Sequence, residues 1–399
     1  MPLSETPNTV ISLMPTLFIW LLGLVFVAVI ITFVFDVSQS KNAILRNYPV
    51  VGHFRYLFST LGEFFRQYFF AMDREEMPFN RAEREWVNRA SADKDNTIAF
   101  GSTKNLTIPG TAIFINCPFP TLDSDAVETR TVTIGDDYSD NPYAAKSIFN
   151  ISGMSYGAIS KPAVLALSNG ARMAGCWMNT GEGGLSSYHL EGGADLVFQI
   201  GTAKYGVRNE DGSLSRKKLS KIAKHEQVKM FELKVSQGAK PGKGGILPGI
   251  KVTTEIAEIR GIPKGEDSNS PNRHIEVSSA SELLDMINRV REITKKPVGF
   301  KTVIGHIRWL EALLAEVNKR GIASAPDFIT VDGGDGGTGA APMALMDNVG
   351  LPLKEALPLV VDKIMQCGLE NRVKGIASGK MITPSRSEER RVGKEWRSR

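Results

Sequence analysis

Two lysines stand inside apolar runs of the sequence, where a charged side chain is costly unless it meets an anion. Lys234 lies in the run MFELKV, and Lys301 lies in VGFKTV. An ammonium group at such a position pairs either with a carboxylate of the chain or with a negatively charged ligand. The sequence leaves both partners open.

An amide and two cations form a second set of residues that could do chemistry. Gln237 and Lys240 lie close together in QGAKPG, and Arg260 follows in EIAEIRG. This set suits a ligand with two carboxylates, because ammonium and guanidinium groups form charge-assisted hydrogen bonds with them. The alternative for Arg260 is an exposed helix residue. Glu182, in TGEGG, is an acid placed between glycines, where the backbone turns tightly.

Glycine surrounds these residues. The 38 glycines among 399 residues exceed the roughly 7% of an average protein. Many of them gather in three regions, Gly153 to Gly201, Gly238 to Gly249 and Gly333 to Gly339. Because glycine has no Cβ, this concentration predicts backbone in close approach to a ligand.

Several other classes of site find no support in the sequence. It contains no P-loop, no G-x-G-x-x-G after a first strand and no H-E-x-x-H, so neither a nucleoside triphosphate, a dinucleotide bound in the Rossmann manner nor zinc is indicated. The three cysteines, Cys117, Cys176 and Cys367, form no C-x-x-C. Such sparse cysteine fits a reducing, cytoplasmic compartment.

The elements that must position these residues alternate between strands and helices. Short apolar runs are followed by glycine or polar residues, and amphipathic segments such as Ala280 to Thr294 and Trp309 to Arg320 lie between several of them. The alternation predicts parallel βαβ units, and seven strands indicate a (β/α)8 TIM barrel without its last strand. An open doubly wound sheet is the alternative. The predicted strands are SIFNIS, CWMNT, LVFQI, MFELKV, VGFKTV, FITVD and RVKGIAS.

The start of the chain is a candidate membrane anchor. The 23 residues from Leu13 to Phe35 carry no charge and can cross a hydrocarbon core of about 30 Å. A cleaved signal peptide fits less well, because only Glu5 is charged before the run and the run is too long. Lys41 and Arg46 follow it, so we expect the rest of the chain to face the cytoplasm.

The segment from His53 to Phe70 repeats aromatic residues and leucines at a spacing of three and four, which predicts an amphipathic helix. It could lie on the membrane surface or dock on the soluble domain. Its few lysines favour docking. Residues 80–145 contain short strand-like pieces such as NTIAFGS and LTIPGTAIFI, and we expect them to form a small extension.

Composition and charge exclude several further classes of protein. Hydrophobic residues at 42% and charged residues at 23% exclude a disordered chain, a collagen-like fibre and a multi-span transporter. The net charge is +5, but residues 387–399 carry five Lys/Arg and three Glu, so no basic face indicates nucleic acid. That tail is predicted to be non-native. We expect an anchor (1–40), a juxtamembrane helical segment and extension (41–146) and the barrel (147–386).

Five stretches follow one another along the chain: GMSYGAIS (Gly153 to Ser160), NTGEGG (Asn179 to Gly184), QIGTAKYGV (Gln199 to Val207), KVSQGAKPGKGGILPG (Lys234 to Gly249) and VDGGDGGTGAAP (Val331 to Pro342). In this order they resemble the FMN-binding synthase domain of glutamate synthase. The resemblance covers residues 90–385, and the apolar start resembles a membrane-anchored bacterial branch of that family, of which we expect this chain to be a C-terminally truncated copy.

The resemblance implies an FMN-dependent oxidoreductase that converts 2-oxoglutarate to glutamate through 2-iminoglutarate. Gln237, Lys240 and Arg260 would bind the substrate, and Glu182 and Lys240 would be catalytic, Glu182 by assisting proton movement and Lys240 by polarising the carbonyl. By the same resemblance, the FMN-binding residues are Gly153, Met154, Ser155, Thr180, Gln199, Lys234, Lys301, Gly336, Gly337 and Gly379.

The chain also departs from the family pattern. It has HIEVSS (His274 to Ser279) where the family has HHDIYS, and none of its cysteines fits the family's three-cysteine [3Fe-4S] cluster. No N-terminal cysteine indicates a glutaminase, so ammonia would be free or come from a separate chain, and electrons from a reductase or ferredoxin. The alternatives are another FMN-barrel oxidoreductase, an enzyme that joins an amine to glutamate, or an inactive truncated copy. Oxidation of a 2-hydroxy acid would need a catalytic histidine, for which His306 is poorly placed.

Overall fold

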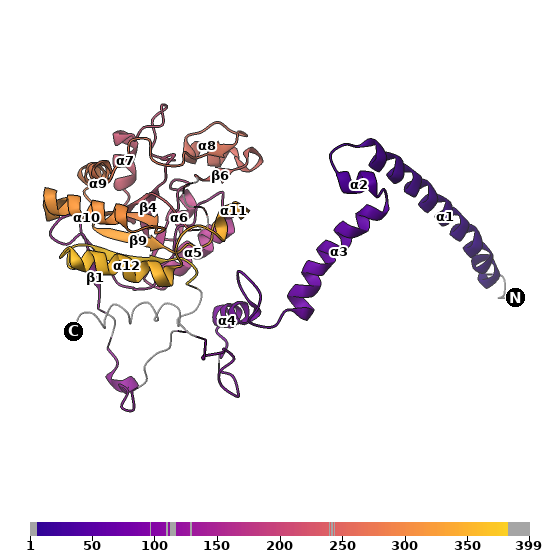
Figure 1. Ribbon diagram of the computed structural model, residues 1–399, viewed down its shortest axis with the longest axis horizontal. Coiled ribbons are helices and arrows are strands. Elements are labelled where there is room, and N and C mark those ends of the chain that lie inside the picture. Colours follow the sequence, from indigo (N-terminus) through magenta and orange to yellow (C-terminus); the bar gives the residue numbers. More distant parts are fainter. Residues whose placement is uncertain are drawn as a thin grey trace. The chain divides into compact units, whose positions relative to one another are not determined.

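The chain forms two compact units, Met1–Pro109 and Gly110–Arg399 (Figure 1). The computed structural model describes residues 6–381, except 96, 109–110, 112–116, 128–129, 239, 241 and 243, and describes side chains from residue 14 onward. The predicted non-native tail, residues 387–399, lies outside the described residues.

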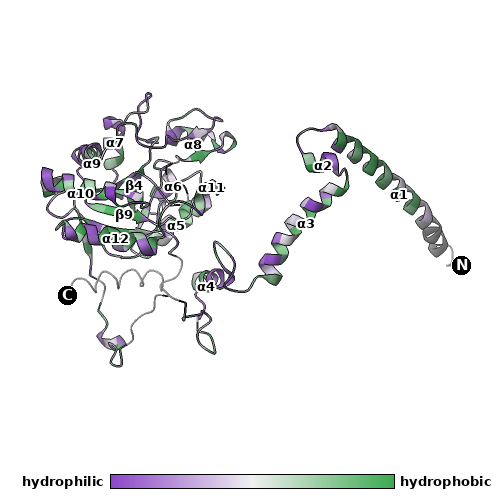
Figure 2. Cartoon of the chain, in the orientation of Figure 1, coloured by the Kyte–Doolittle hydropathy of each residue, from purple (hydrophilic) through white to green (hydrophobic). Residues whose placement is uncertain are grey.

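The first unit is built from helices. Within α1 the segment Met14–Ser38 is long and apolar enough to cross a membrane, although a signal sequence meets the same criteria (Figure 2). The aromatic repeat forms a helix, as its spacing predicts. The helices are α1 (Thr6–Ser38), α2 (Ala43–Asn47), α3 (Val51–Phe65), a π-helical turn (Arg66–Phe70) and α4 (Arg81–Ser91).

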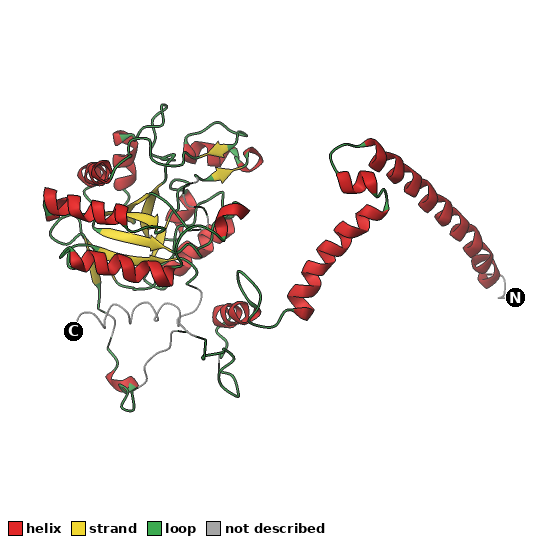
Figure 3. Cartoon of the chain, in the orientation of Figure 1, coloured by secondary structure: helices red, strands yellow, loops and turns green. Residues whose placement is uncertain are grey.

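A six-stranded parallel sheet forms the centre of the second unit (Figure 3). Six of the seven predicted strands are strands in the described residues, whereas SIFNIS contributes an isolated bridge from Ile151 to Met178. The spatial order is β10-β9-β8-β5-β4-β3. The strands are β3 (Trp177–Asn179), β4 (Asp195–Ile200), β5 (Val228–Lys234), β8 (Val298–Val303), β9 (Phe328–Asp332) and β10 (Lys374–Ser378).

This strand order runs in one direction and never reverses. A doubly wound sheet requires a reversal, whereas a barrel does not. The fold is therefore an α/β fold with a curled parallel sheet, a half-barrel. Its two ends approach each other, since Ser152 Oγ lies 3.3 Å from Ser378 Oγ.

Helices cover the outer face of the sheet, where they bury Phe231, Phe300 and other apolar side chains. The predicted helices at 280–294 and 309–320 are confirmed, because both present leucines to the sheet at helical spacing. The helices are α5 (Lys161–Met173), α6 (Ser187–Glu191), α7 (Arg216–Ala223), α8 (Thr254–Arg260), α9 (Ala280–Thr294), α10 (Arg308–Arg320), α11 (Met343–Met346) and α12 (Leu353–Gln366), with 3-10 turns at Asp123–Asp125, Gly249–Lys251 and Ile322–Ser324.

The inner face of the sheet is apolar near the N-terminal ends of its strands. Trp177, Val197, Met230 and Phe328 pack there against a hairpin of β1 (Val132–Ile134) and β2 (Tyr143–Ala145). Tyr143 also donates a hydrogen bond to Asp195 Oδ2 at 3.0 Å. This hairpin, which the sequence assigned to the extension, thus packs with the sheet.

Two further local features differ from the expectations. The described parts of NTIAFGS (97–102) and of LTIPGTAIFI (106–108 and 111) contain turns and no strand, and the other residues of the two pieces lie outside the described residues. Between β5 and β8 the chain makes an excursion in which β6 (Ile246–Leu247) pairs with β7 (Ser268–Asn269) and α8 lies between them. This excursion carries Arg260.

Candidate active site

Polar side chains replace apolar ones halfway along the inner face of the sheet. Glu232, in the middle of β5, is only 3% exposed. Its Oε1 accepts hydrogen bonds from Asn179 Nδ2 (2.8 Å) and Gln199 Nε2 (2.7 Å), and its Oε2 accepts one from Thr330 Oγ1 (2.6 Å). Four strands therefore meet at this one carboxylate.

Asn179 connects this carboxylate to the loop after β3. Its Oδ1 accepts a hydrogen bond from the Gly181 amide at 2.9 Å. Gly181 has a φ of +64°, and a Cβ there would lie 2.7 Å from Ser155 N. Only glycine suits this turn, because other residues strain at positive φ and because the neighbouring backbone is in contact.

The turn at Gly181 places the next residue, Glu182, beside β5. Glu182 Oε1 lies 2.9 Å from Lys234 Nζ. Lys234 lies on the same face of β5 as Glu232. Burial raises the pKa of Glu182, but Lys234, and beyond it Lys240 and Arg260, more than offset this effect and hold the pKa below its usual value. Glu182 is therefore an ionised carboxylate that pairs with Lys234 and is further stabilised by the charges of Lys240 and Arg260.

Arg260 is 6% exposed, so it is not an exposed helix residue. Its guanidinium lies 5.0 Å from the ring centre of Tyr205, and its Nη1 is 3.4 Å from Ser268 Oγ. Burial lowers its pKa, although Tyr205 and Glu182 favour the charged form. The Nε donor is buried without a hydrogen-bond partner in the described residues, which leaves one buried donor unsatisfied.

Lys301 has a carboxylate partner within the chain. Its Nζ lies 3.4 Å from Asp332 Oδ2, which also accepts a hydrogen bond from the Gly238 amide at 2.8 Å. The sequence left open whether Lys234 and Lys301 pair with a carboxylate of the chain or with a ligand. In the structure both lysines pair with a carboxylate of the chain. Asp332 additionally joins the end of β9 to the loop that carries Gln237.

Two buried histidines hold backbone carbonyls at the strand ends. His274 Nε2 donates to the Lys234 carbonyl oxygen at 3.0 Å, and His189 Nε2 donates to that of Met154 at 2.9 Å. Burial, reinforced by Lys204, lowers the pKa of His274 to about 4. Burial likewise lowers the pKa of His189. Both rings are therefore neutral at pH 7.

The segment HIEVSS, where the chain departs from the family pattern, is anchored by an ion pair. Glu276 Oε2 lies 2.8 Å from Nζ of Lys204, a lysine whose side chain is fully buried. The acid in this segment thus joins it to the loop after β4. His306, in contrast, is exposed and accepts a hydrogen bond from the Arg308 amide.

Two cavities border the predicted site residues but do not sort them by role, because Lys234, which is predicted to bind FMN, lines the smaller cavity together with Gln237. The smaller, about 20 Å³, is lined by Glu182, Lys234 and Gln237. The larger, about 1480 Å³, lies along the inner face of the sheet and α12 and is lined by Met154, Lys301 and Gly379. Lys240, 5% exposed, lies in the same loop as Gln237.

The remaining predicted residues mostly contact the protein itself. The Thr180 hydroxyl accepts from the Gln199 amide at 3.1 Å and donates to the Gly181 carbonyl at 3.0 Å. A Cβ on Gly153 would meet Asn179 and Gln199, and one on Gly336 or Gly379 would meet Gly333. Only Gly337 among these predicted glycines has open space. Close approach therefore explains most of them, but the neighbouring atoms belong to the protein itself.

Residues 112–386 match the family described as "Conserved region in glutamate synthase". The chain belongs to the glutamate synthase family. The match spans the curled sheet and the residues that line both cavities. The family resemblance of the sequence motifs is thereby confirmed.

The relatives within the glutamate synthase family differ in coverage. The glutamate synthase large subunit-like protein YerD of Bacillus subtilis (strain 168) is 38% identical over 408 residues, covering 92% of this chain and 77% of that protein. The archaeal glutamate synthase (NADPH) of Methanocaldococcus jannaschii is 37% identical over 232 residues, covering 57% of this chain and 42% of that protein. Outside these sequence relatives, a solved structure of a flavocytochrome b2 variant with sulfite bound is 12% identical, with a TM-score of 0.37, and the match covers 62% of this chain and 55% of that one.

Sequence reasoning missed several residues of this candidate site. Glu232, Asn179, Asp332 and His274 were not singled out as site residues, although each holds a loop or a lysine in place. For Glu232 a signal exists, because a carboxylate stands in the apolar run MFELKV two residues before Lys234. Alternation along a strand places both side chains on one face.

Proposed function

We propose that this chain is a glutamate synthase-type oxidoreductase that reductively aminates 2-oxoglutarate to glutamate through 2-iminoglutarate. The observation that carries the proposal is the group of cations around Glu182. Lys234 pairs with this carboxylate, and Lys240 and Arg260 both lower its pKa. A small anion with more than one carboxylate fits such a site.

Arg260, Lys240 and Gln237 would bind the substrate. The buried Arg260 Nε has no hydrogen-bond partner in the described residues, so it can donate to a carboxylate. Lys240 would polarise the ketone by stabilising negative charge on its oxygen. Gln237, which lines the smaller cavity, would orient the chain of the substrate through its amide.

Glu182 would move protons as the ketone becomes an imine. Addition of ammonia to the carbonyl carbon breaks the C=O π bond and leaves a proton to be removed from nitrogen. Loss of water then requires a proton on the departing oxygen. The ionised carboxylate can accept the first proton, and once protonated it supplies the second.

The larger cavity supports FMN as the cofactor. Its volume of about 1480 Å³ exceeds that of common ligand sites, about 300–1,000 Å³. Met154, Lys301 and Gly379 in its wall would hold the group. Three other predicted residues do not line this cavity, namely Thr180, Gln199 and Lys234. Reduced FMN would supply the hydride that converts the imine to glutamate.

We further propose a single-pass membrane protein whose second unit faces the cytoplasm. The apolar segment Met14–Ser38 and the positive charges that follow it support this orientation. Ammonia would be free or come from a separate glutaminase, and electrons from a reductase or ferredoxin. Flotation of the full chain with lipid vesicles at high salt tests the anchor, and a chain that stays in the dense fractions would contradict it.

The decisive experiment uses Lys240→Ala in the full chain with added FMN. We expect the variant to lose 2-oxoglutarate-dependent oxidation of its reduced flavin by at least about 100-fold, because a charge that stabilises the transition state is removed. Lys217→Ala, at an exposed lysine on α7, is the control and should keep the parent rate. Equal rates in both variants would refute the proposal.

A further inference from the structure

The helix α3 and the π-helical turn that follows it form a strongly two-sided surface. At 100° per residue, eight large apolar side chains fall within an arc of about 140°. Arg55, Thr60, Glu63 and Arg66 lie outside that arc. The aromatic face, as we name this arc, consists of Phe54, Leu57, Phe58, Leu61, Phe64, Phe65, Tyr68 and Phe69.

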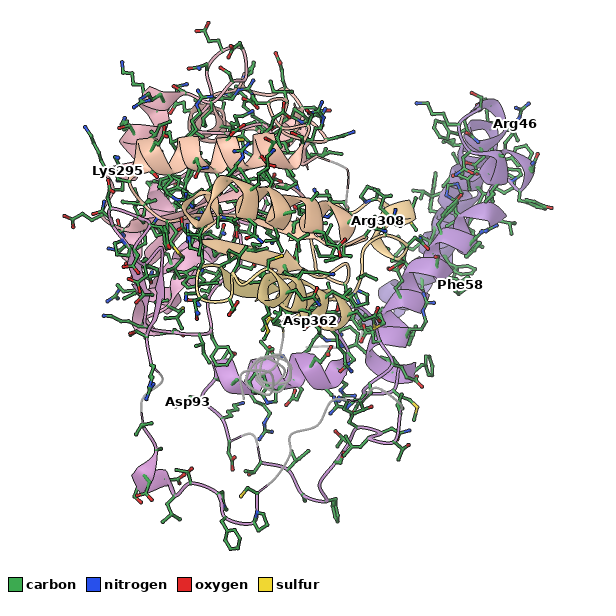
Figure 4. The ribbon with its side chains drawn as sticks, turned by 60° about the vertical axis from the view of Figure 1, so that its left-hand side comes forward. Arg46, Phe58, Asp93, Lys295, Arg308 and Asp362 are labelled. Atoms are coloured by element: carbon green, nitrogen blue, oxygen red, sulfur yellow. The ribbon has the colours of Figure 1, made fainter. Side chains whose placement is uncertain are left out.

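The aromatic face is uncovered within the first unit. Phe54 is 53% exposed, Phe58 65% and Phe69 66%. In Figure 1 α1 and α3 leave α2 as separate arms, and Figure 4 shows the labelled Phe58 projecting from α3. An apolar face of this size on an exposed helix marks a contact surface.

A clamp of hydrogen bonds fixes the start of α3 to the end of α1. Asp36, which is 1% exposed, accepts hydrogen bonds from the Val50 amide (2.9 Å) and from His53 Nε2 (3.0 Å). Asn42 and Tyr56 add a hydrogen bond of 2.9 Å between the connecting turn and α3. If α1 spans the bilayer, α3 must therefore begin at the level of the lipid headgroups.

The composition of the surface also fits that level. Phenylalanine, leucine and tyrosine make up the aromatic face, and such residues concentrate at the boundary between headgroups and acyl chains. Arg55, Arg66 and Glu63 all lie on the polar side, so the net charge of the segment is small. Binding should then depend on apolar burial rather than on anionic lipid.

We propose that α3 and its π-helical turn lie in the membrane interface with the aromatic face buried in lipid. This inference rests on the proposed membrane anchor. It replaces the docking on the soluble domain that the sequence favoured, because the clamp joins α3 directly to the end of the candidate span. The catalytic unit would then be attached through a helix lying along the membrane as well as one crossing it.

Spin labels on the full chain in phosphatidylcholine nanodiscs test the proposal. Cysteines are placed singly by Phe58→Cys and Leu61→Cys on the aromatic face, by Thr60→Cys on the polar face and by Leu24→Cys in α1. Cys117 and Cys367 are first changed to Ser. Collision of each label with lipid-soluble oxygen is compared with its collision with a water-soluble nickel chelate, and circular dichroism checks the fold.

We expect oxygen to exceed the chelate at Phe58, Leu61 and Leu24, and the ratio to invert at Thr60. A lipid-exposed Leu24 with water-exposed labels at Phe58 and Leu61 would overturn the inference and leave the anchor intact. Low collision with both reagents at Phe58 and Leu61 would show protein docking and would also overturn it. Water exposure at Leu24 and Phe58 together would refute both the anchor and the inference.

Discussion

At the scale of single residues, Glu232 organises the candidate site without lining the smaller cavity. Its two oxygens hold Asn179, Gln199 and Thr330. Asn179 in turn holds the Gly181 amide, and the next residue, Glu182, returns to Lys234 on the same strand as Glu232. These contacts form a closed ring, so displacing one member shifts the others.

The substitution Glu232→Gln should weaken this ring. The carboxylate accepts three hydrogen bonds, whereas the amide of glutamine turns an NH2 group towards at least one of those three donors. One buried donor then lacks an acceptor, at a cost of about 1–3 kcal/mol. We expect a lower free energy of unfolding in denaturant titrations and a reduced rate with 2-oxoglutarate. Glu292→Gln, at an exposed position on α9, is the control. Wild-type stability and rate in Glu232→Gln would contradict the ring.

The buried His274 should make stability depend on acid. Its pKa is lowered to about 4 in the fold, against 6.5 for an ordinary histidine. Between these values the unfolded chain binds a proton that the folded chain does not, so stability falls as the pH drops from 6.5 towards 4. The full effect is about 3 kcal/mol, since one pKa unit corresponds to about 1.4 kcal/mol.

Denaturant titrations at several pH values, with wild type and His274→Asn, measure this contribution. Above pH 6.5 the difference between the two free energies of unfolding should be constant. Below pH 6.5 the free energy of unfolding of the wild type should fall relative to that of His274→Asn. Equal pH dependence in the two proteins would show that His274 does not titrate as its burial indicates. His189, also buried with a lowered pKa, stays in both proteins and cancels in the comparison.

At the scale of elements, the loops at the strand ends pack against each other through glycine. Gly181 contacts the loop at Ser155, and a Cβ on Gly238 would lie 1.8 Å from the Gly333 carbonyl oxygen. The glycines therefore allow close packing between the loops around the site as well as at the strand ends. The histidine contacts at Met154 and Lys234 fix the same edge of the sheet.

Two glycine substitutions should have opposite effects. Gly181→Ala introduces a Cβ at a φ of +64° and 2.7 Å from Ser155 N. We expect backbone strain alone to lower the free energy of unfolding by about 1–2 kcal/mol, and we expect Glu182 to be displaced. Gly170→Ala lies inside α5 with nothing within 4 Å of the new Cβ. This substitution should raise the free energy of unfolding by about 0.5–1 kcal/mol, because alanine favours a helix interior more than glycine does. Thermal unfolding of both variants measures the pair, and a neutral Gly181→Ala would refute the tight turn.

At the scale of the whole second unit, the half-barrel leaves its interior open. The sheet ends approach at Ser152 and Ser378, yet no hydrogen-bonded strand joins Ile151 to β10 in the described residues. The apolar wall of the larger cavity includes Leu357 and Val361 of α12. A cofactor in so open a cavity is only partly enclosed, and enclosure is what gives small-molecule sites their affinity.

We therefore expect the 399-residue chain to retain little or no FMN through purification. Added FMN should bind weakly and reversibly. Absorbance spectra of the purified protein measure retention, and quenching of flavin fluorescence on titration measures binding. A yellow protein that keeps stoichiometric FMN after gel filtration would show that the half-barrel encloses the cofactor without a further strand.

Local patterns in the sequence predicted much of the fold. The helices at 280–294 and 309–320, six of the strands and the apolar helix follow from periodicity, because hydrophobic spacing reports which face of an element is buried. The first predicted strand forms only a bridge, and the hairpin at 132–145 packs with the sheet, since both depend on contacts with distant segments.

The sequence by itself determined the family, through ordered motifs, and placed Lys234 and Lys301 at strand ends and Glu182 in a tight turn between glycines. Only the tertiary structure decided their partners. Thr330 and the carboxylate of Glu232 meet across 98 positions of sequence, and Asp332 reaches both Lys301 and the Gly238 amide. Such pairings depend on the curvature of the sheet, which brings the inner faces of several strands to one point and which no local pattern of residues encodes.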